Sequence, residues 1–340
     1  MDLLSALSSR RPSSLIGTLL ACLAIILLSR RLIRLRHSRS LKVPYNQERV
    51  VILGASGGIG RAIAHKYAAR GARVCVIGRR EVELAKVVEE CRAFHLSHNT
   101  GAIRAGGSTI FSVAADFTNV EDMVHIRSTV EAEWKGLDTL IVCAGVSALC
   151  PLMEVAGLER HGQTFTPAQA TMEGIQRTVN VTNAAVKGNY VGPLVSAVTF
   201  IPLLASASAS PSILLVSSLA AVIPPPTRSL YASTKAASLM LYQVLAIEHP
   251  EIAFTHFIPS TVEGDFRTSA VDSGRVREAE PNKHGLKREA VARRCVEAVD
   301  EGERMVFMPV ILGRGGQIGQ LFFPAVVEWI ARRKYRFSAI

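Results

Sequence analysis

A tyrosine and a lysine four residues apart, with a serine upstream, are the residues of this chain best suited to acid/base chemistry. Tyr231 and Lys235 belong to the sequence Tyr-Ala-Ser-Thr-Lys, and on a helix positions i and i+4 lie on the same face. An ammonium held beside a phenol favours the phenolate and lowers the pKa of the tyrosine toward neutrality. Such a tyrosine can exchange a proton with a carbonyl or alcohol oxygen. The hydroxyl of Ser218, at the end of an expected buried strand, can orient that oxygen.

A glycine-rich segment lies upstream, in the context that a dinucleotide-binding turn requires. An apolar run at residues 49–53 is typical of a strand, and Gly-Ala-Ser-Gly-Gly-Ile-Gly follows at residues 54–60. Residues 61–70 then have a helical pattern, before a second strand at residues 73–77. The glycines permit a tight turn and a close approach of the backbone to a pyrophosphate, which faces free N–H groups at the helix N-terminus. The segment therefore predicts a dinucleotide site.

Each acid/base candidate also has a purely structural interpretation. Tyr231 could be a core tyrosine, Lys235 an exposed helix residue and Ser218 a strand hydroxyl with an ordinary partner. Their occurrence together, behind a cofactor-binding turn, favours a catalytic site over three unrelated structural roles.

These motifs together resemble the short-chain dehydrogenase/reductase family. The features that carry the resemblance are the spacing Gly-x-x-x-Gly-x-Gly, Cys-Ala-Gly at residues 143–145, Asn189, Ser218 and the Tyr-x-x-x-Lys motif. They fall in the family's order over roughly residues 47–310. The chain is most similar to the membrane-anchored members that act on steroids, retinoids and other lipids.

The resemblance implies a role for each motif residue. Tyr231 would be the general acid/base, and Lys235 would lower its pKa and hold the nicotinamide ribose. Ser218 would steady the substrate oxygen, and Asn189 would hold a water that feeds protons to the lysine. The residues expected to contact the cofactor are Gly54, Ser56, Gly58, Ile59, Gly60, Arg79, Arg80, Asp116, Phe117, Cys143, Ala144, Gly145, Tyr231, Lys235, Pro259, Thr261 and Val262.

The chain departs from the family pattern at three positions. Leu53 stands where a threonine usually precedes the first glycine, and Cys143 replaces the first asparagine of Asn-Ala-Gly. Gly264 lacks the hydroxyl that usually meets the nicotinamide amide, which Thr261 could supply instead. Because none of these positions belongs to the proton-transfer set, we expect them to alter cofactor affinity more than reaction type.

The end of the second strand indicates which nicotinamide cofactor the site prefers. An NAD-specific site places an acidic residue there, whereas a nearby arginine accommodates a 2′-phosphate. Gly78 occupies the acidic position, and Arg79 and Arg80 follow. The two arginines could instead be solvated residues that begin the next helix. The missing acid favours NADP(H), and Asp116 with Phe117 resembles the family's adenine contact.

Length and patterning predict an α/β protein with a doubly wound parallel sheet, that is, a Rossmann fold. The chain has 340 residues, of which 49% are hydrophobic, enough for a large core. Segments between the expected strands are mostly helical, which favours a single parallel sheet. We expect one catalytic domain at residues 47–312. Its strands are expected near residues 49–53, 73–77, 110–115, 138–143, 212–217, 252–258 and 305–309.

The basic residues gather at the two ends of the chain. Residues 1–46 contain eight Lys/Arg and one acid, a formal +7, and residues 332–336 add +4. Together they account for the whole formal charge of +11. A nucleic-acid-binding protein would spread its basic residues over a folded face, so we expect no nucleic-acid partner. Basic residues that flank apolar segments indicate lipid headgroups instead.

The first apolar segment predicts a membrane anchor. Residues 13–29 are uncharged and reach the lower length limit of a bilayer-spanning helix, after a tail at residues 1–12 and before a basic linker at residues 30–46. A cleaved signal peptide is the alternative, but no small-residue cleavage pattern follows. The more basic flank after the span places the catalytic domain in the cytosol. The expected location is the endoplasmic reticulum membrane, crossed once.

A second apolar segment lies near the C-terminus. Within the expected C-terminal unit, residues 313–340, the run 321–330 precedes the basic residues, and Pro324 suits the first turn of a helix. The segment is equally consistent with an ordinary packing contact and with a contact to membrane lipid.

Cysteines and histidines indicate no metal. The six cysteines include no Cys-x-x-Cys pair, and the nine histidines do not cluster.

The sequence as a whole predicts an NADP(H)-dependent oxidoreductase that interconverts a lipophilic ketone and a secondary alcohol. Two alternatives remain open: an isomerase or dehydratase on the same fold, and a membrane adaptor that binds NADP(H) without turnover. The resemblance also implies a homodimer.

Overall fold

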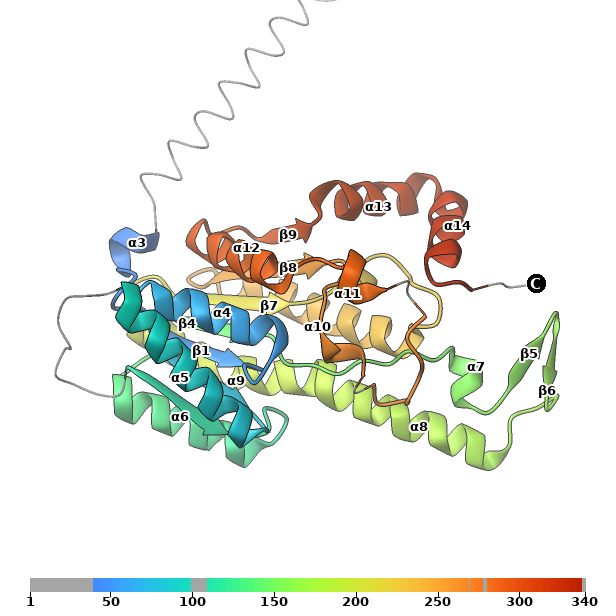
Figure 1. The fold of residues 1–340 in the computed structure, drawn as a ribbon, viewed down its shortest axis with the longest axis horizontal. Coiled ribbons are helices and arrows are strands. Elements are labelled where there is room, and N and C mark those ends of the chain that lie inside the picture. Colours follow the sequence, from blue (N-terminus) through green and yellow to red (C-terminus); the bar gives the residue numbers. More distant parts are fainter. Residues whose placement is uncertain (1–38, 99–108, 269, 278–279, 338–340) are drawn as a thin grey trace, which may run out of the picture.

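A seven-stranded parallel sheet forms the centre of the molecule (Figure 1). The computed structural model describes residues 39–98, 109–268, 270–277 and 280–337, so the expected anchor at residues 13–29 lies outside the described residues. The order of the strands is β3-β2-β1-β4-β7-β8-β9. They are β1 (Arg49–Leu53), β2 (Arg73–Gly78), β3 (Ile110–Ala114), β4 (Thr139–Val142), β7 (Ser212–Val216), β8 (Ala253–Pro259) and β9 (Met305–Met308).

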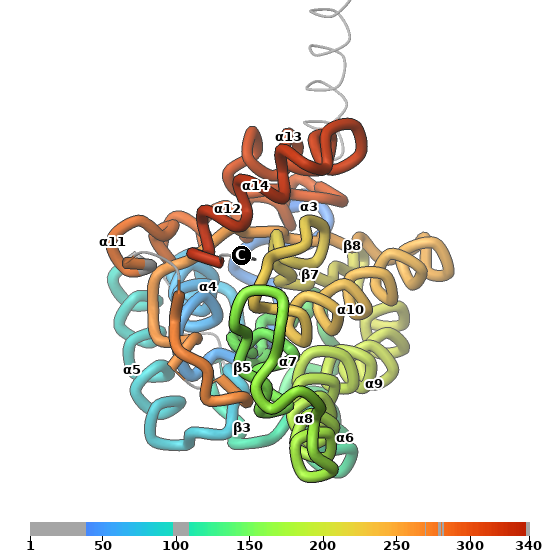
Figure 2. Tube along the Cα trace, turned by 90° about the vertical axis from the view of Figure 1, so that its right-hand side faces the viewer, coloured from blue at the N-terminus to red at the C-terminus, as the bar shows by residue number. Residues whose placement is uncertain are grey.

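Helices cover both faces of this sheet, and the two layers are separated most clearly in Figure 2. One layer consists of α4 (Gly58–Ala69), α5 (Glu81–His98) and α12 (Arg288–Asp300). The other consists of α6 (Val120–Trp134), α9 (Gly192–Ala207) and α10 (Ser229–Glu248). The predicted doubly wound α/β fold is therefore confirmed.

Alternation along each strand explains how one sheet supports two cores. Successive side chains of a strand point to opposite faces. In β1, Val50 and Ile52 belong to the core under α4 and α5, whereas Val51 and Leu53 belong to the core under α6 and α9. Since both faces are covered, the central strands β1, β4 and β7 are mostly apolar and buried, as in other parallel sheets.

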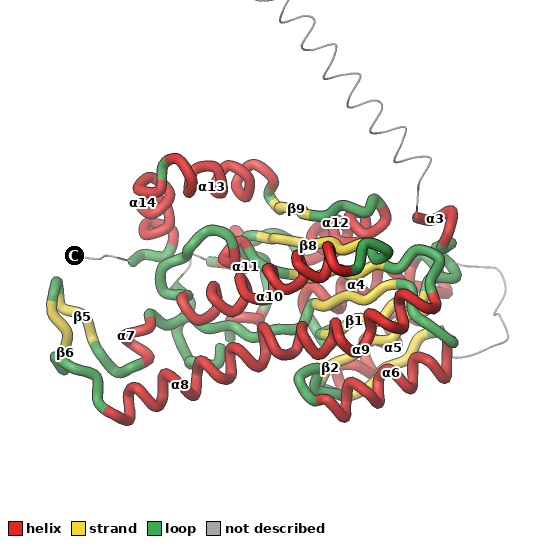
Figure 3. The backbone as a smooth tube through the Cα atoms, turned by 180° about the vertical axis from the view of Figure 1, so that it is seen from behind, coloured by secondary structure: helices red, strands yellow, loops and turns green. Residues whose placement is uncertain are grey.

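The remaining elements lie at the edges of the sheet or lead to the cleft described below. They are α3 (Arg39–Lys42), α7 (Leu152–Val155), β5 (Glu159–His161), β6 (Thr164–Thr166), α8 (Met172–Val186), the π-turn η1 (Lys187–Val191), the 3₁₀ turns η2 (Leu219–Ala221) and η3 (Asp265–Arg267), α11 (Pro281–His284), α13 (Val310–Phe322) and α14 (Pro324–Lys334). Figure 3 shows that α8 and α9 continue one another and run beside α10. Pro324 occupies the first turn of α14, as predicted.

The continuous helix from Met172 to Ala207 is, among the described residues, the one long and apolar enough to cross a membrane by length and composition. Its most apolar window is 44% buried inside the protein. The α9 portion packs against β4 and α6, where Phe200 and Leu204 join the core. Packing of α9 on the sheet accounts for the apolar composition of that part of the helix.

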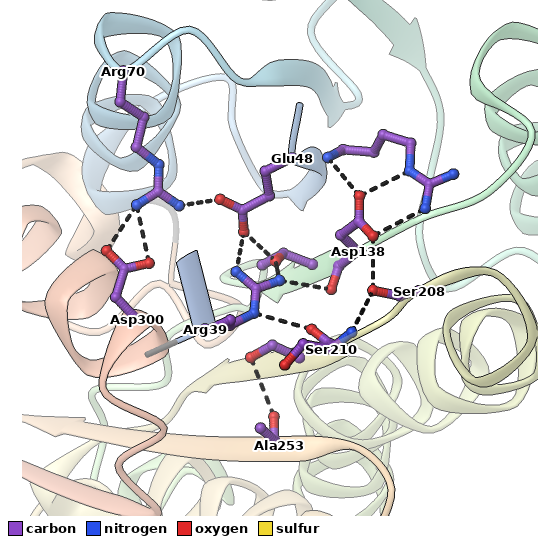
Figure 4. Close-up of polar contacts among 11 residues, drawn as sticks. Arg39, Glu48, Arg70, Asp138, Ser208, Ser210, Ala253 and Asp300 are labelled. Carbon is purple, nitrogen blue, oxygen red and sulfur yellow. Dashed lines mark hydrogen bonds and ion pairs between the residues drawn. The ribbon is translucent and has the colours of Figure 1, made fainter. Parts of the chain in front are cut away.

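A buried ionic network lies at the N-terminal ends of the strands (Figure 4). Arg39 of α3 is only 6% exposed, and its Nη1 lies 2.5 Å from Oε1 of the fully buried Glu48. Glu48 also pairs with Arg70 and accepts a hydrogen bond from the hydroxyl of Thr139. Arg39 belongs to the segment 30–46 that the sequence predicts to be a basic linker. Its pair with Glu48 holds α3 against the folded domain.

Candidate active site

The carboxyl ends of the strands open into one cleft of about 1330 Å³. In an open parallel sheet, ligands bind outside these ends, where the strand order reverses. Here the reversal falls between β1 and β4. The glycine turn after β1 and the turn after β4 both line the cleft, as do residues from β7, α10 and the segment after β8.

Glycines shape the turn after β1. Gly54 has φ +90°, and a Cβ there would lie 2.6 Å from the backbone nitrogen of Ala144. A Cβ on Gly60 would lie 2.3 Å from the carbonyl oxygen of Gly54. Larger residues therefore do not fit, and α4 begins at Gly58 with its N-terminus at the cleft. This is a cradle suited to a pyrophosphate, so the residues present fit a dinucleotide.

The acid/base candidates meet in the same cleft. Tyr231 and Lys235 lie one turn apart on α10, both are buried, and both line the cleft with Ser218. The ammonium of Lys235 donates to the carbonyl oxygen of Val216 at 3.2 Å, which fixes the side chain at the end of β7. The Ser218 hydroxyl accepts a hydrogen bond from the backbone of Ala220 at 3.2 Å and begins η2.

Asn189 lies behind the cleft wall rather than in it. Its Oδ1 accepts from the backbone nitrogen of Val146 at 2.9 Å, and its Nδ2 donates to the Val146 carbonyl and to the hydroxyl of Thr234. The residue is fully buried within the π-turn η1, a deviation that often marks functional sites. A Cβ on Gly145 would lie 2.8 Å from Asn189 Oδ1 and 3.3 Å from Lys235 Nζ. Gly145 therefore lets the asparagine and the lysine approach the same backbone.

Arg79, Arg80 and Asp116 line the opposite end of the cleft. Arg80 Nη2 lies 3.1 Å from both the carbonyl oxygen and the hydroxyl of Ser56. Partial burial favours a higher pKa for Asp116, but hydrogen bonds from Thr118 and the charge of Arg79 hold its pKa below the usual value.

Phe117 and Cys143 complete this part of the wall. Phe117 packs on Gly192, where a Cβ would lie 2.3 Å from its ring. Burial raises the pKa of the Cys143 thiol to about 11, although Lys235 and the backbone of Gly60 act in the opposite direction. Cys143 is therefore a neutral thiol at physiological pH, and its place beside Gly60 is that of a small packing residue.

All but two of the residues predicted for the site line the cleft; Gly60 and Asn189 lie just behind its wall. The cleft also contains Arg61, Lys187, Arg228 and Arg288, which sequence reasoning missed. The first three could have been found from the sequence, because each lies close to a predicted site motif. Arg61 follows the glycine turn, Lys187 precedes Asn189 and Arg228 precedes Tyr231. Within the described ranges, no group of three or more His, Cys, Asp or Glu could hold a metal ion.

Two irregular segments, residues 146–177 and 264–287, are expected from the sequence to select the substrate. Of these segments, Val146, residues 264–268 and Val271 line the cleft. The exposed hairpin β5–β6 does not line the cleft. Instead, α13, α14 and the residue between them supply much of the wall, through Ile311, Leu312, Phe323, Val326, Val327 and Ile330.

The fold and site together define a dinucleotide-binding α/β protein with a tyrosine and a lysine at the cofactor end of its cleft. The sequence profile of the short chain dehydrogenase family matches residues 48–273. The chain belongs to this family.

Two curated plant proteins illustrate the relationship. A protein of Sesamum indicum named 11-beta-hydroxysteroid dehydrogenase A is 27% identical over 85% of this chain and 76% of its own length. A protein of Arabidopsis thaliana named 11-beta-hydroxysteroid dehydrogenase-like 4A is 28% identical over 64% of this chain. That match spans 62% of the Arabidopsis protein, less than two thirds of its length.

Two solved structures share the fold. An alcohol dehydrogenase from Thermococcus sibiricus complexed with 5-hydroxy-NADP has a TM-score of 0.59 at 22% identity, covering 77% of this chain and 94% of that one. A short chain dehydrogenase/reductase from Burkholderia phymatum in complex with NAD has a TM-score of 0.64 at 17% identity, covering 82% and 95%.

Proposed function

We propose that this protein is an NADP(H)-dependent oxidoreductase that interconverts a lipophilic ketone and the corresponding secondary alcohol. The observation that carries the proposal is the meeting of Tyr231, Lys235 and Ser218 with the glycine turn in one cleft. A nicotinamide cofactor, when bound, supplies or accepts the hydride.

The chain's own residues would manage the proton. In reduction, the Tyr231 hydroxyl donates its proton to the developing alkoxide, and the Ser218 hydroxyl donates a hydrogen bond to the same oxygen. Lys235, held on the Val216 carbonyl, supplies a positive charge beside the cofactor end of the site. Asn189 fixes the Val146 backbone and so positions the wall on which the lysine lies.

A preference for NADP(H) is supported by the residues after β2. Gly78 ends the strand where an NAD-specific site has an acid, and Arg79 and Arg80 follow it into the cleft. A guanidinium can bind a phosphate in a bidentate manner, which suits a ribose 2′-phosphate. One structural relative was solved with an NADP derivative and another with NAD, so the fold is compatible with both cofactors.

A lipophilic substrate is supported by the far end of the cleft. Leu219, Ile223 and Phe266 line it together with the apolar side chains of α13 and α14. The names of the plant relatives point in the same direction, because a hydroxysteroid is a lipophilic secondary alcohol. Steroid, retinoid and sphingoid ketones are therefore the first substrates to test.

The direct test is NADPH oxidation with this panel, comparing the wild type with Tyr231→Phe. Loss of a positioned general acid typically lowers the rate by roughly 10²–10⁴-fold. We expect a loss of this size in kcat with NADPH binding retained. Tyr45→Phe, whose ring packs on Arg70 outside the cleft, is the matched control. Full turnover by Tyr231→Phe would refute the mechanism, and tight NADPH binding without oxidation of any ketone would favour an adaptor.

For its setting, we propose a single anchor at residues 13–29 in the endoplasmic reticulum membrane, with the catalytic domain in the cytosol. The basic flank of that segment supports this orientation. Protease digestion of sealed microsomes should then degrade the catalytic domain, and its full protection would contradict the orientation.

We also propose a homodimer formed through α8 and α10. The two helices pack together, and each exposes apolar side chains, including Ile175, Val179, Met240 and Ile247. Light scattering in detergent tests the stoichiometry. A Met240→Glu variant that remains dimeric would exclude this interface.

A further inference from the structure

The two C-terminal helices expose an unusual amount of apolar surface. No residue of α14 is buried, and Ile311 of α13 is 89% exposed. The exposed apolar side chains of this hairpin, hereafter the C-terminal hairpin (Val310–Lys334), are Val310, Ile311, Leu312, Ile318, Leu321, Phe322, Phe323, Val326, Trp329 and Ile330. Contiguous patches of this kind mark interaction sites on soluble domains.

Charge accompanies this apolar surface. Residues 310–337 contain five Lys/Arg and a single acid, Glu328, a formal +4. Three of these cations, Arg332, Arg333 and Lys334, form the last turn of α14, and Arg333 lies 5.7 Å from the ring of Trp329. An apolar helix face with an aromatic residue beside cations is the pattern of a helix lying at an anionic membrane surface.

The apolar surface also continues into the cleft. Ile311, Phe323 and Ile330 are exposed and at the same time line the cleft that contains Tyr231. The hairpin is therefore one wall of the cleft and part of the outer surface. A lipophilic molecule that reaches this surface would meet apolar side chains from there to the catalytic residues.

The position of α3 indicates that the partner of this surface is a lipid bilayer. In Figures 1, 2 and 3, α3 and the C-terminal hairpin both lie in the upper part of the molecule, although α3 and α14 lie at opposite ends in Figures 1 and 3. The predicted anchor precedes α3 in the chain, and α3 is held to the domain through the buried pair Arg39–Glu48. A bilayer crossed by the anchor would therefore lie on the same side of the molecule as the hairpin.

We propose that the C-terminal hairpin is a second membrane contact, which docks on an anionic phospholipid surface and opens the cleft toward the bilayer. The inference deepens the proposed function, because it rests on a lipophilic substrate using this cleft. The substrate would then pass from the bilayer to Tyr231 without crossing bulk water.

The distribution of tryptophan makes the proposal directly testable in the full-length protein. The chain has two tryptophans: Trp134 is 4% exposed in the core under α6, and Trp329 is 60% exposed on α14. The protein is reconstituted into phosphatidylcholine/phosphatidylserine vesicles whose acyl chains carry bromine, which quenches nearby tryptophan. We expect loss of most Trp329 emission, since an interfacial helix buries its apolar face roughly 5–10 Å deep.

Variants with a single tryptophan show which of the two tryptophans is quenched. Trp134→Phe should show the full quenching and Trp329→Phe almost none. An unquenched Trp329 in protein that co-floats with the vesicles would overturn the proposal. A blue shift without quenching that grows with protein concentration would also overturn it, because a second copy would then cover the hairpin.

A charge substitution tests the surface without touching the cleft. Leu321→Glu with Phe322→Glu lies outside the cleft lining and should abolish the quenching and raise the KM for a bilayer-partitioned ketone. Its kcat for a water-soluble ketone in detergent should be unchanged. Val82→Glu, an exposed apolar position on α5, is the matched control and should keep the quenching. Quenching needs no turnover, so Tyr231→Phe should quench normally, which separates a failure of docking from a failure of the proposed function.

Discussion

Arg80 reaches across the glycine turn to Ser56 and thereby defines the rim of the cofactor end. Its guanidinium lies 3.1 Å from where a Cβ on Gly57 would stand, so glycine at that position leaves room for the arginine. The neighbouring Arg79 lowers the pKa of Asp116 instead, together with hydrogen bonds from Thr118 that oppose the effect of burial. The two adjacent arginines therefore have different surroundings, and Arg80 is the one that contacts Ser56 of the glycine turn.

Arg80→Gln should weaken the binding of NADPH more than that of NADH. A hydrogen bond to a charged group contributes about 1.5–3 kcal/mol, which corresponds to a rise in KM for NADPH of about 10- to 100-fold. Initial rates with each cofactor measure the effect. Arg293→Gln, an exposed arginine of α12 outside the cleft, is the control. An equal change in KM for both cofactors would show that Arg80 does not bind the 2′-phosphate.

Arg228 lies near both Tyr231 and Tyr335 of the C-terminal segment. The residue is buried, and its guanidinium carbon lies 5.6 Å from the ring centroid of Tyr231 and 5.8 Å from that of Tyr335. The preceding Thr227 has φ 69°, a strained conformation for a β-branched residue that costs roughly 1–3 kcal/mol. This turn places the Arg228 guanidinium close to the rings of both Tyr231 and Tyr335.

At the level of elements, the apolar runs of the chain were sufficient to predict the central sheet. Each of the seven strands ends within one residue of its predicted limits. β4 and β7 are buried throughout and so give an unbroken apolar signal, whereas the outer strand β3 is only partly buried. The short hairpin β5–β6 was not predicted, because its exposed residues, such as Glu159 and Thr164, have no apolar period.

The site was predictable wherever chemistry depends on local spacing. Gly54, Tyr231 and Lys235 belong to motifs that can be recognised along the chain, and the structure brings them into one cleft. The cleft wall formed by α13 and α14 was not predictable, since it depends on how a distant helix packs. Asn189 was expected at the site from its motif, but its hydrogen-bond partners Val146 and Thr234 were not predictable, because they are far from it in sequence.

Asp138 connects three elements at the N-terminal edge of the sheet. Before β4, its carboxylate pairs with Arg49 of β1 at 2.8 Å and accepts a hydrogen bond from Ser208 after α9. Burial favours a higher pKa for Asp138, but these hydrogen bonds and the charge of Arg49 lower its pKa overall. Because the folded-state pKa lies below the unfolded value, the stabilisation is present above about pH 4 and is lost as pH falls through the folded-state pKa.

Asp138→Asn should therefore destabilise the protein at neutral pH and reduce its sensitivity to acid. Removing one partner of a buried ion pair costs about 3–5 kcal/mol. Urea unfolding at neutral pH and at about pH 3 measures both effects, and the difference between variant and wild type should shrink in acid. Glu121→Gln, an exposed carboxylate of α6, provides the comparison. A difference that does not shrink in acid would contradict the assignment.

On the scale of the whole molecule, the two ends of the strands differ in what they contain. The cleft lined by Tyr231, Lys235 and Ser218 lies at the carboxyl ends of the strands, whereas the ionic network of Figure 4 lies at their amino ends. Arg39, Glu48 and Arg70 tie α3 to β1, α4 and, through Asp300, α12. If the anchor leads into α3, this network fixes how the catalytic domain is held relative to the bilayer.

The ionic network predicts a ranking of how strongly substitutions within it lower the stability of the protein. Glu48→Gln should lower the free energy of unfolding by about 3–5 kcal/mol, because it leaves the buried Arg39 and the partly buried Arg70 without their shared carboxylate. Arg39→Met should cost less, since Glu48 keeps Arg70 and the Thr139 hydroxyl. The double variant should cost less than the sum, because both changes act on one contact. Urea unfolding of the full-length protein in detergent gives the free energies, and hydrogen exchange of residues 39–48 should report release of α3 in both variants. Strict additivity, or unchanged exchange in Arg39→Met, would mean that α3 is held by contacts other than this pair.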